Sequence, residues 1–298
     1  MFEVNEIYQP MDLPEALVLA KQHPQAIIIA GGTDVLIQIR EGKLANRELL
    51  NIHGLSELQG IEKNEAGDLL IGPLSSFKDV EENALINRHI PILAQAASMV
   101  GGPQIRVMGT IGGNVANGVT SADTSSTLHA LEAQLVLESE AAKRIIPIEN
   151  YYLGPAQTAR ANGEILTKII IRGVNYRGSG GCYIKYAMRE AMDIATLGCA
   201  VLVSPAKDSS CISRIRIAFG VAAPVPIRTK NAEAKLSGLD IDEAGYRIAS
   251  LIREEINPRD SWRASREFRL HIAGVMAERA LSKAWQQALE RRRAECGK

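Results

Sequence analysis

The sequence predicts an α+β fold in three parts, and two observations lead to this prediction. The run Ala26–Ala30 is short, continuously apolar and rich in β-branched residues, which is typical of a strand buried on both faces in a parallel sheet. Three apolar or alternating segments between Cys182 and Gly220 have the spacing of an antiparallel meander. We therefore expect a small α/β unit over residues 1–55, a second unit over 56–176, and a C-terminal antiparallel sheet with helices over 177–298.

The first part is expected to contain two helices and two strands around a glycine turn. Asp12 and Glu15 have the spacing of a capped helix start, and this helix runs to about His23. The strand at Ala26–Ala30 follows it. The remaining elements are a short helix over residues 35–39 and a second strand over 48–52.

The second and third parts are separated by Gly178–Gly181, which we expect to be a flexible break. Ser76 can cap a helix that begins at Phe77, and an apolar helix from Pro91 to Val100 stops at a glycine pair. The other expected elements are a helix over residues 122–131, strands over 69–71, 134–138, 164–171, 182–187, 196–203 and 212–220, and a C-terminal helix.

Two glycine pairs, each with a threonine beside it, are the most informative feature of the chain. They lie in the segments Ala30–Asp34 and Gly109–Asn114. Because glycine has no Cβ, backbone N–H groups in such segments can approach a phosphate closely. Gly31-Gly32 alone is as compatible with a tight strand-to-helix turn as with a phosphate site. The second pair lies in a stretch, Gly101–Gly118, that holds six glycines among many hydrogen-bonding side chains, and this favours one large ligand with a pyrophosphate, held from two sides.

The common nucleotide motifs are absent. Neither the dinucleotide pattern G-x-G-x-x-G nor the Walker pattern occurs at the first strand, which disfavours a nicotinamide-binding doubly wound sheet. Asp123 follows the second glycine segment and could accept a hydrogen bond from a sugar hydroxyl or cap the helix that starts there. Of these two roles, the cap is the safer expectation.

Composition excludes several classes of function. The formal net charge is +0 and aromatic residues make up 4% of the chain, so we expect no nucleic-acid partner. The four cysteines show no metal-ligand spacing, so we expect neither a metal site nor an iron–sulfur cluster. The N-terminus lacks the basic residues of a signal peptide, and no apolar run is long enough to span a membrane. We therefore expect a cytoplasmic protein without a membrane partner.

Several segments together resemble the FAD-binding subunit of the molybdenum hydroxylase family. The resemblance starts from Ala30–Asp34, Thr110–Asn114 and Ser121–Asp123, and extends to Lys185–Arg189 and Phe219–Pro224. It covers nearly the whole chain and is closest to the bacterial xanthine dehydrogenase members of the family. It implies a two-subdomain FAD-binding fold of the vanillyl-alcohol-oxidase (VAO/PCMH) type, followed by a domain like the C-terminal domain of the CO dehydrogenase flavoprotein.

The resemblance also implies which residues hold the cofactor. Ile28–Asp34 would wrap the pyrophosphate and adenosine, Asp123 would bind the ribityl or ribose region, and Lys185 would lie near the flavin. Val100 stands where animal xanthine dehydrogenases place an aromatic ring against the flavin. No histidine lies in either glycine segment, so we expect the FAD to be bound non-covalently. The implied cofactor-binding residues are Ile28, Ile29, Ala30, Gly31, Gly32, Thr33, Asp34, Val100, Gly109, Thr110, Ile111, Gly112, Gly113, Asn114, Ser121, Asp123, Leu166 and Lys185.

The implied activity is that of an oxidoreductase subunit of the xanthine dehydrogenase type. A partner subunit with a molybdenum cofactor would oxidise a purine, a second partner with [2Fe–2S] clusters would relay electrons to FAD, and NAD+ would accept them. The three subunits would form a heterotrimer that dimerises. No catalytic acid, base or nucleophile is needed in this chain, because the flavin carries the electrons.

Alternatives remain open at this point. The chain could be a self-sufficient FAD-dependent oxidoreductase of the same fold, the flavin subunit of a hydroxylase for an aldehyde, CO or an aromatic heterocycle, or a scaffold with vestigial glycine turns. Arg189 and Asp193 could shape the flavin side or form a surface ion pair. We expect valine at Gly32 or Gly112 to abolish FAD binding with little loss of fold.

Overall fold

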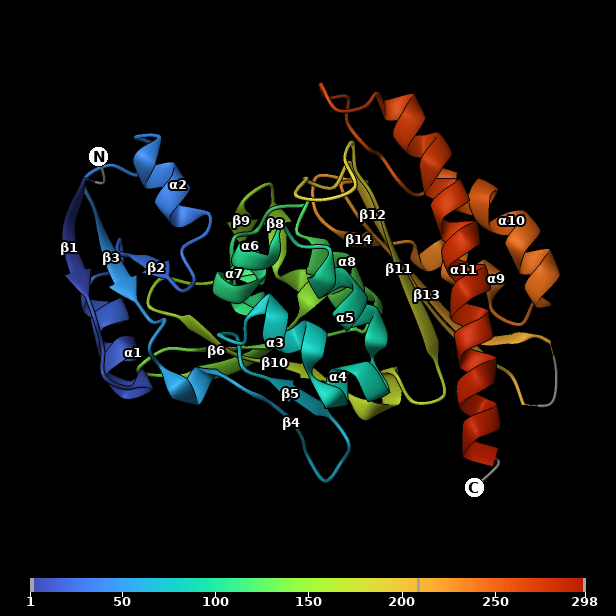
Figure 1. The fold of residues 1–298 in the computed structure, drawn as a ribbon, viewed down its shortest axis with the longest axis horizontal. Helices are drawn as coiled ribbons and strands as arrows, with labels where there is room; N and C mark the ends of the chain where they lie inside the picture. Colours follow the sequence, from blue (N-terminus) through green and yellow to red (C-terminus); the bar gives the residue numbers. More distant parts are fainter. Residues whose placement is uncertain (1–2, 208–209, 297–298) are drawn as a thin grey trace.

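The computed structural model describes residues 3–207 and 210–296, which form three main sheets in succession along the molecule. Figure 1 shows the first sheet and its helices at one end, a central layer of helices over the second sheet, and the third sheet covered by the long C-terminal helix at the other end. The predicted α+β class is confirmed.

The first sheet is parallel and has the order β1 (Val4–Tyr8), β3 (Arg47–Asn51), β2 (Ile27–Ile29). The helices α1 (Leu13–Gln22) and α2 (Val35–Arg40) connect its strands. As predicted, the Asp12 side chain caps α1 and accepts from the Glu15 N–H at 2.9 Å.

The expectation that the strand after α1 is buried on both faces is wrong. β2 is the edge strand of a three-stranded sheet, and only Ile29 of its three isoleucines is fully buried. A sheet this narrow leaves its edge strands partly open, so the apolar run indicates a strand without fixing its place in the sheet.

The second sheet is antiparallel and receives its helices from one long connection between β5 and β6. Its order is β4 (Ile61–Lys63), β5 (Leu69–Ile71), β10 (Ile165–Ile171), β6 (Gln134–Glu138), β7 (Lys143–Pro147). The connecting helices are α3 (Phe77–Glu82), α4 (Ala84–His89), α5 (Pro91–Ser98), α6 (Pro103–Met108), α7 (Ile111–Ala116) and α8 (Asp123–Ala130). A small hairpin, β8 (Tyr152–Gly154) with β9 (Gln157–Thr158), follows β7.

The glycine-rich stretch is therefore more ordered than a loop. Two short helices, α6 and α7, occupy most of Gly101–Gly118. Proline begins α6, and Thr110 caps α7 through its hydroxyl, which accepts from the Gly113 N–H at 3.1 Å. These local start signals outweigh the low helix propensity of glycine.

The third sheet is the predicted antiparallel meander. Its order is β11 (Gly180–Tyr186), β12 (Leu197–Pro205), β13 (Ile212–Gly220), β14 (Ile227–Arg228). The helices α5 and α8 contact one face, and α11 (Arg266–Cys296) packs against β11 and β12, with α9 (Lys230–Leu236) and α10 (Ile241–Arg253) beside it. Both faces are thus covered, and all residues from Leu197 to Val203 are buried.

Gly180 and Gly181 are not a flexible break but the first residues of β11, and both are buried. A Cβ at Gly180 would lie 2.0 Å from the Ala284 carbonyl oxygen. The missing side chain is what lets the backbone of α11 approach the strand.

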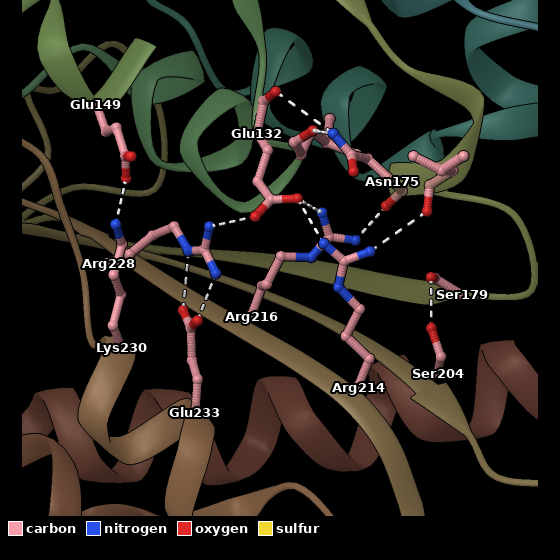
Figure 2. Close-up of polar contacts among 12 residues, drawn as sticks. Glu132, Glu149, Asn175, Ser179, Ser204, Arg214, Arg216, Arg228, Lys230 and Glu233 are labelled. Carbon is pink, nitrogen blue, oxygen red and sulfur yellow. Dashed lines mark hydrogen bonds and ion pairs between the residues drawn. The ribbon is translucent and has the colours of Figure 1, made fainter. Parts of the chain in front are cut away.

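Glu132, which follows α8, joins the central layer to the third sheet. Its carboxylate accepts from Arg214 at 2.6 Å, from Arg216 at 2.8 Å and from Arg228 at 2.7 Å (Figure 2). Arg216 is only 2% exposed and also donates to the Asn175 carbonyl oxygen. Burial alone would raise the pKa of Glu132, but the three guanidinium groups outweigh it and hold this pKa below its ordinary value.

We predict that Glu132→Gln lowers the free energy of unfolding by about 2 kcal/mol, because it leaves the buried Arg216 charge without its carboxylate. Because the pKa of Glu132 is lowered in the folded protein, the loss of stability is fully present above the ordinary glutamate pKa. The loss becomes smaller as the pH falls through the pKa that Glu132 has in the folded protein. Urea unfolding at several pH values measures it. Glu243→Gln, which breaks the exposed pair with Arg247, is the control and should change stability by less than about 0.5 kcal/mol.

Candidate functional site

The structure brings the two glycine segments into direct contact. Gly31 follows β2, and a Cβ on it would lie 1.7 Å from the carbonyl oxygen of Met108 and 3.1 Å from the Cα of Gly109. The Asn117 side chain also donates to the Asp34 carboxylate at 2.7 Å. We call Gly31–Asp34 together with Met108–Asn117 the glycine junction.

One side of the glycine junction offers free backbone donors. Within the described residues, no hydrogen bond uses the N–H of Gly31, Gly32, Thr33 or Asp34. The Thr33 hydroxyl likewise has no partner in this part of the chain. Successive unpaired N–H groups in a turn form a concave site for an anion. The first glycine pair therefore has the geometry that a phosphate group requires.

The other side of the junction uses its N–H groups internally. The Ile111 N–H donates to Ser75 O at 3.0 Å and the Gly112 N–H to Pro73 O at 2.8 Å, while the Gly113 N–H donates to the Thr110 hydroxyl. Both glycine pairs therefore allow a close packing contact, Gly31 with Met108 and Gly112 with Pro73, but only the first pair keeps unpaired donors. The sequence did not distinguish these two contributions.

The glycines of the junction differ in what a side chain would meet. At Gly112 a Cβ would lie 2.3 Å from the Pro73 Cβ, and Gly32 has φ +70. Valine at either position disturbs the fold itself, so the expectation that such variants leave the fold intact is wrong. Gly113 is exposed, and a Cβ there would meet only the Thr110 hydroxyl, at 3.0 Å.

Asp123 does not cap α8, and that expectation is corrected. Ala122 is the N-cap residue, and no side chain caps the helix. The Asp123 carboxylate instead accepts from the Tyr183 hydroxyl at 2.9 Å and from the Lys185 ammonium at 2.8 Å. Two donors from β11, 60 and 62 positions later in the sequence, thus take the place of the local N–H groups.

The Asp123–Lys185 pair is buried, with both side chains 8% exposed. Lys185 also donates to the Met99 carbonyl oxygen at 2.9 Å, which places it beside Val100. Burial raises the pKa of Asp123, and the nearby ammonium works against that rise. Tyr183 and Lys185 share one face of β11 because strand side chains alternate, so the spacing in the sequence could have linked Tyr183 to this pair.

The remaining expected residues lie around these two centres. Ile29 and Ile111 are buried in the core, Leu166 is buried in β10, which contacts α7, and Ser121 is partly exposed. Asn114 accepts from the Thr124 hydroxyl at 2.5 Å. Thr124, Tyr183 and Asn117 were absent from the expected set, because their partners come from other elements.

The segment between β11 and β12 lies against the glycine turn that follows α5. A Cβ on Gly102 would lie 3.2 Å from the Met192 side chain. Asp193 fixes this segment: its carboxylate accepts from the Met188, Arg189 and Ile194 N–H groups at 3.0, 3.0 and 2.8 Å. Arg189 and Asp193 also form an ion pair at 3.6 Å.

The described residues contain neither a metal-binding group of side chains nor a membrane-spanning helix. In that part of the chain, no three His, Cys, Asp or Glu side chains are grouped so that they could hold a metal ion. None of its helices combines the length and the apolar character needed to cross a membrane.

The chain matches known protein families over most of its length. Residues 2–171 match the family described as FAD binding domain in molybdopterin dehydrogenase, and residues 182–284 match the CO dehydrogenase flavoprotein C-terminal domain. The xanthine dehydrogenase FAD-binding subunit of Escherichia coli O157:H7 is 39% identical over 285 residues, covering 95% of this chain and 97% of that protein. The carbon monoxide dehydrogenase medium chain of Hydrogenophaga pseudoflava is 30% identical, covering 94% and 96%.

The solved structures give the same result. A carbon monoxide dehydrogenase structure from Hydrogenophaga pseudoflava superimposes with a TM-score of 0.90 at 30% identity, over 96% of this chain and 99% of that chain. The match to residues 182–284 confirms the predicted type of C-terminal domain.

We predict that Lys185→Met lowers the free energy of unfolding by about 3 kcal/mol at pH 8, because Asp123 is left buried without its counter-charge. The pKa of Asp123 then rises further, so the carboxyl takes up a proton as pH falls and the loss becomes smaller at pH 5. Urea unfolding at both pH values measures this.

The double variant Asp123→Asn, Lys185→Met is the matched control. It removes both charges and should recover most of the lost stability. A double variant as unstable as Lys185→Met alone would show that the loss comes from packing of the lysine stem and not from the buried charge.

Proposed function

Because this chain belongs to the FAD-binding subunits of the molybdenum hydroxylase family, we propose that it is the electron-transfer subunit of a xanthine dehydrogenase-type enzyme. In this proposal it binds FAD non-covalently, receives electrons from [2Fe–2S] clusters of a partner subunit and passes them to NAD+. The observation that carries the cofactor site is the set of four unpaired backbone N–H groups at Gly31–Asp34, in contact with the second glycine segment.

The residues present fit a dinucleotide of the FAD type. The unpaired N–H groups and the Thr33 hydroxyl suit the two negative charges of a pyrophosphate. The missing side chain at Gly113 leaves room for a ligand beside the glycine junction, because a Cβ there would meet only the Thr110 hydroxyl. Ile28–Ala30 would border the adenosine, and Gly109–Asn114 would border the pyrophosphate from the opposite side.

The flavin end of the site is assigned to the buried Asp123–Lys185 pair. When bound, FAD supplies the redox chemistry, and the protein supplies orientation and charge. Lys185 is held between Asp123 and the Met99 carbonyl oxygen, so its positive charge has a fixed position. Val100 and Leu166 would provide aliphatic contacts, and Ser121 a hydroxyl, near the same end.

The proposed partners and organisation follow from the relatives. The relatives are named as a subunit and as a medium chain, which supports a complex. We propose a heterotrimer with a molybdenum-cofactor subunit and a [2Fe–2S] subunit, dimerised and cytoplasmic. We also propose the division of the chain at residues 55 and 176, which the three separate sheets support.

A second candidate is the flavin subunit of a hydroxylase with another substrate. The similarity to carbon monoxide dehydrogenase, 30% identity with a TM-score of 0.90, favours this candidate. In both candidates the substrate binds to another chain, so the activity of the purified complex decides between them.

We predict that Gly113→Val lowers bound FAD at least tenfold without unfolding the protein, because the new side chain fills space at the glycine junction. The visible flavin absorbance per chain, after reconstitution with excess FAD, measures the loss. Gly54→Val is the matched control, since Gly54 is also exposed and a Cβ there meets nothing within 4 Å. A Gly113→Val protein that keeps its full complement of FAD would place the cofactor elsewhere.

The electron-transfer role is tested on the complex. We expect the chain to co-purify with molybdenum and iron–sulfur subunits, and the complex to oxidise xanthine with NAD+ as acceptor. The flavin-loaded chain alone should not oxidise xanthine. Turnover by the isolated chain would instead indicate a self-sufficient oxidoreductase, and a chain that cannot be loaded with FAD would indicate a scaffold.

A further inference from the structure

An open cleft of about 670 Å³ lies between the central layer and the third sheet. Its walls come from the end of α8, from β6, β13, β14 and α9, and from two 3₁₀ turns, Ile148–Asn150 after β7 and Gly173–Asn175 after β10. Its volume lies in the range of small-molecule sites. None of the expected FAD-binding residues lines it, so it is separate from the glycine junction and from the Asp123–Lys185 pair.

The cleft is positively charged although the chain as a whole is neutral. Three carboxylates line it, those of Glu132, Glu149 and Glu233. The cationic residues that line it are Arg172, Arg214, Arg216, Arg228 and Lys230. His129 is neutral at pH 7, since burial lowers its pKa to about 4. The lining therefore carries two positive charges in excess, against a formal net charge of +0 for the whole chain.

Each of the three carboxylates already has a cationic partner. Glu132 accepts from three arginines, Glu233 pairs with Arg228, and Glu149 accepts from Lys230 at 2.7 Å (Figure 2). The network is thus complete without Arg172. The Arg172 side chain is exposed and has no hydrogen bond or ion pair with any described residue, so its guanidinium is free to bind a ligand.

Further cationic donors line the same cleft. The Lys230 and Arg214 side chains are 60% and 44% exposed, so a ligand in the cleft can reach both. Deeper in the cleft, the buried Nε of Arg216 has no hydrogen-bond partner among the described residues. Neutral His129 donates from Nδ1 to the Ser125 carbonyl oxygen at 2.7 Å, so its Nε2 is an acceptor and adds no donor to the cleft. Cationic donors therefore come from both walls, Arg172 from the central part and Arg214 and Lys230 from the C-terminal part.

We propose that this cleft binds a small phosphate-bearing anion, with Arg172, Arg214 and Lys230 as its principal ligands. Two excess positive charges match the charge of a phosphate group near neutral pH. Guanidinium groups bind phosphate oxygens through paired N–H donors. A ligand held from both walls bridges the FAD-binding part and the C-terminal sheet.

Calorimetric titration of pyrophosphate into the full chain, saturated with FAD, tests the proposal. Saturation with FAD prevents pyrophosphate from binding at the glycine junction. We expect saturable binding that Arg172→Gln weakens at least tenfold and that Arg172→Lys weakens less, because lysine keeps the charge but loses the paired donors. Arg253→Gln should leave the affinity unchanged, since Arg253 is an exposed arginine of α10 that does not line the cleft.

Three outcomes would overturn the proposal. The first is no binding of pyrophosphate to the FAD-saturated chain. The second is binding that Arg172→Gln leaves unchanged, which would place the anion elsewhere. The third is tighter binding of succinate than of pyrophosphate, which would mean that the cleft selects carboxylates. Arg172 has no partner among the described residues, so its replacement should not unfold the protein, and thermal unfolding of each variant verifies this.

Discussion

The close approach of two backbones, at Gly31 and at Met108–Gly109, determines where the proposed cofactor site can form. With any side chain at Gly31, the first sheet could not lie against the turn between α6 and α7, because a Cβ would overlap the Met108 carbonyl oxygen. Residues far apart in the sequence meet there, and the unpaired N–H groups of Gly31–Asp34 lie beside this contact. The site is therefore a property of two packed segments and not of one motif.

A second constraint comes from burying charge. Asp123 is placed at the start of α8 by the central layer, but both groups that stabilise its carboxylate, Tyr183 and Lys185, come from the third sheet. A buried carboxylate without such partners is costly. The FAD-binding part alone would leave Asp123 uncompensated, so the C-terminal sheet is needed to complete the site.

Much of the fold could be predicted from local signals, since helix caps, apolar runs and glycine turns act over a few residues. Asp12 and Ser76 cap their helices, and the meander from β11 to β13 has the expected order. The predictions that were wrong concerned residues whose partners lie far away in the sequence. The partial burial of β2 follows from its place at a sheet edge, and the role of Gly180 follows from the approach of α11. Asp123 was assigned to the nearest N–H groups, whereas its partners come from β11.

The helix α8 connects these constraints. All eight of its residues are buried, and each end has a carboxylate directed to the third sheet: Asp123 pairs with β11, and Glu132, just beyond the helix, pairs with β13 and β14. The position of the sheet relative to the central layer is therefore fixed at both ends of one helix. An anion bound in the cleft as proposed would lie beside Arg214 and Glu132, next to the C-terminal end of the helix that carries Asp123. The charged cleft and the proposed flavin site therefore lie at opposite ends of α8, although they share no residue.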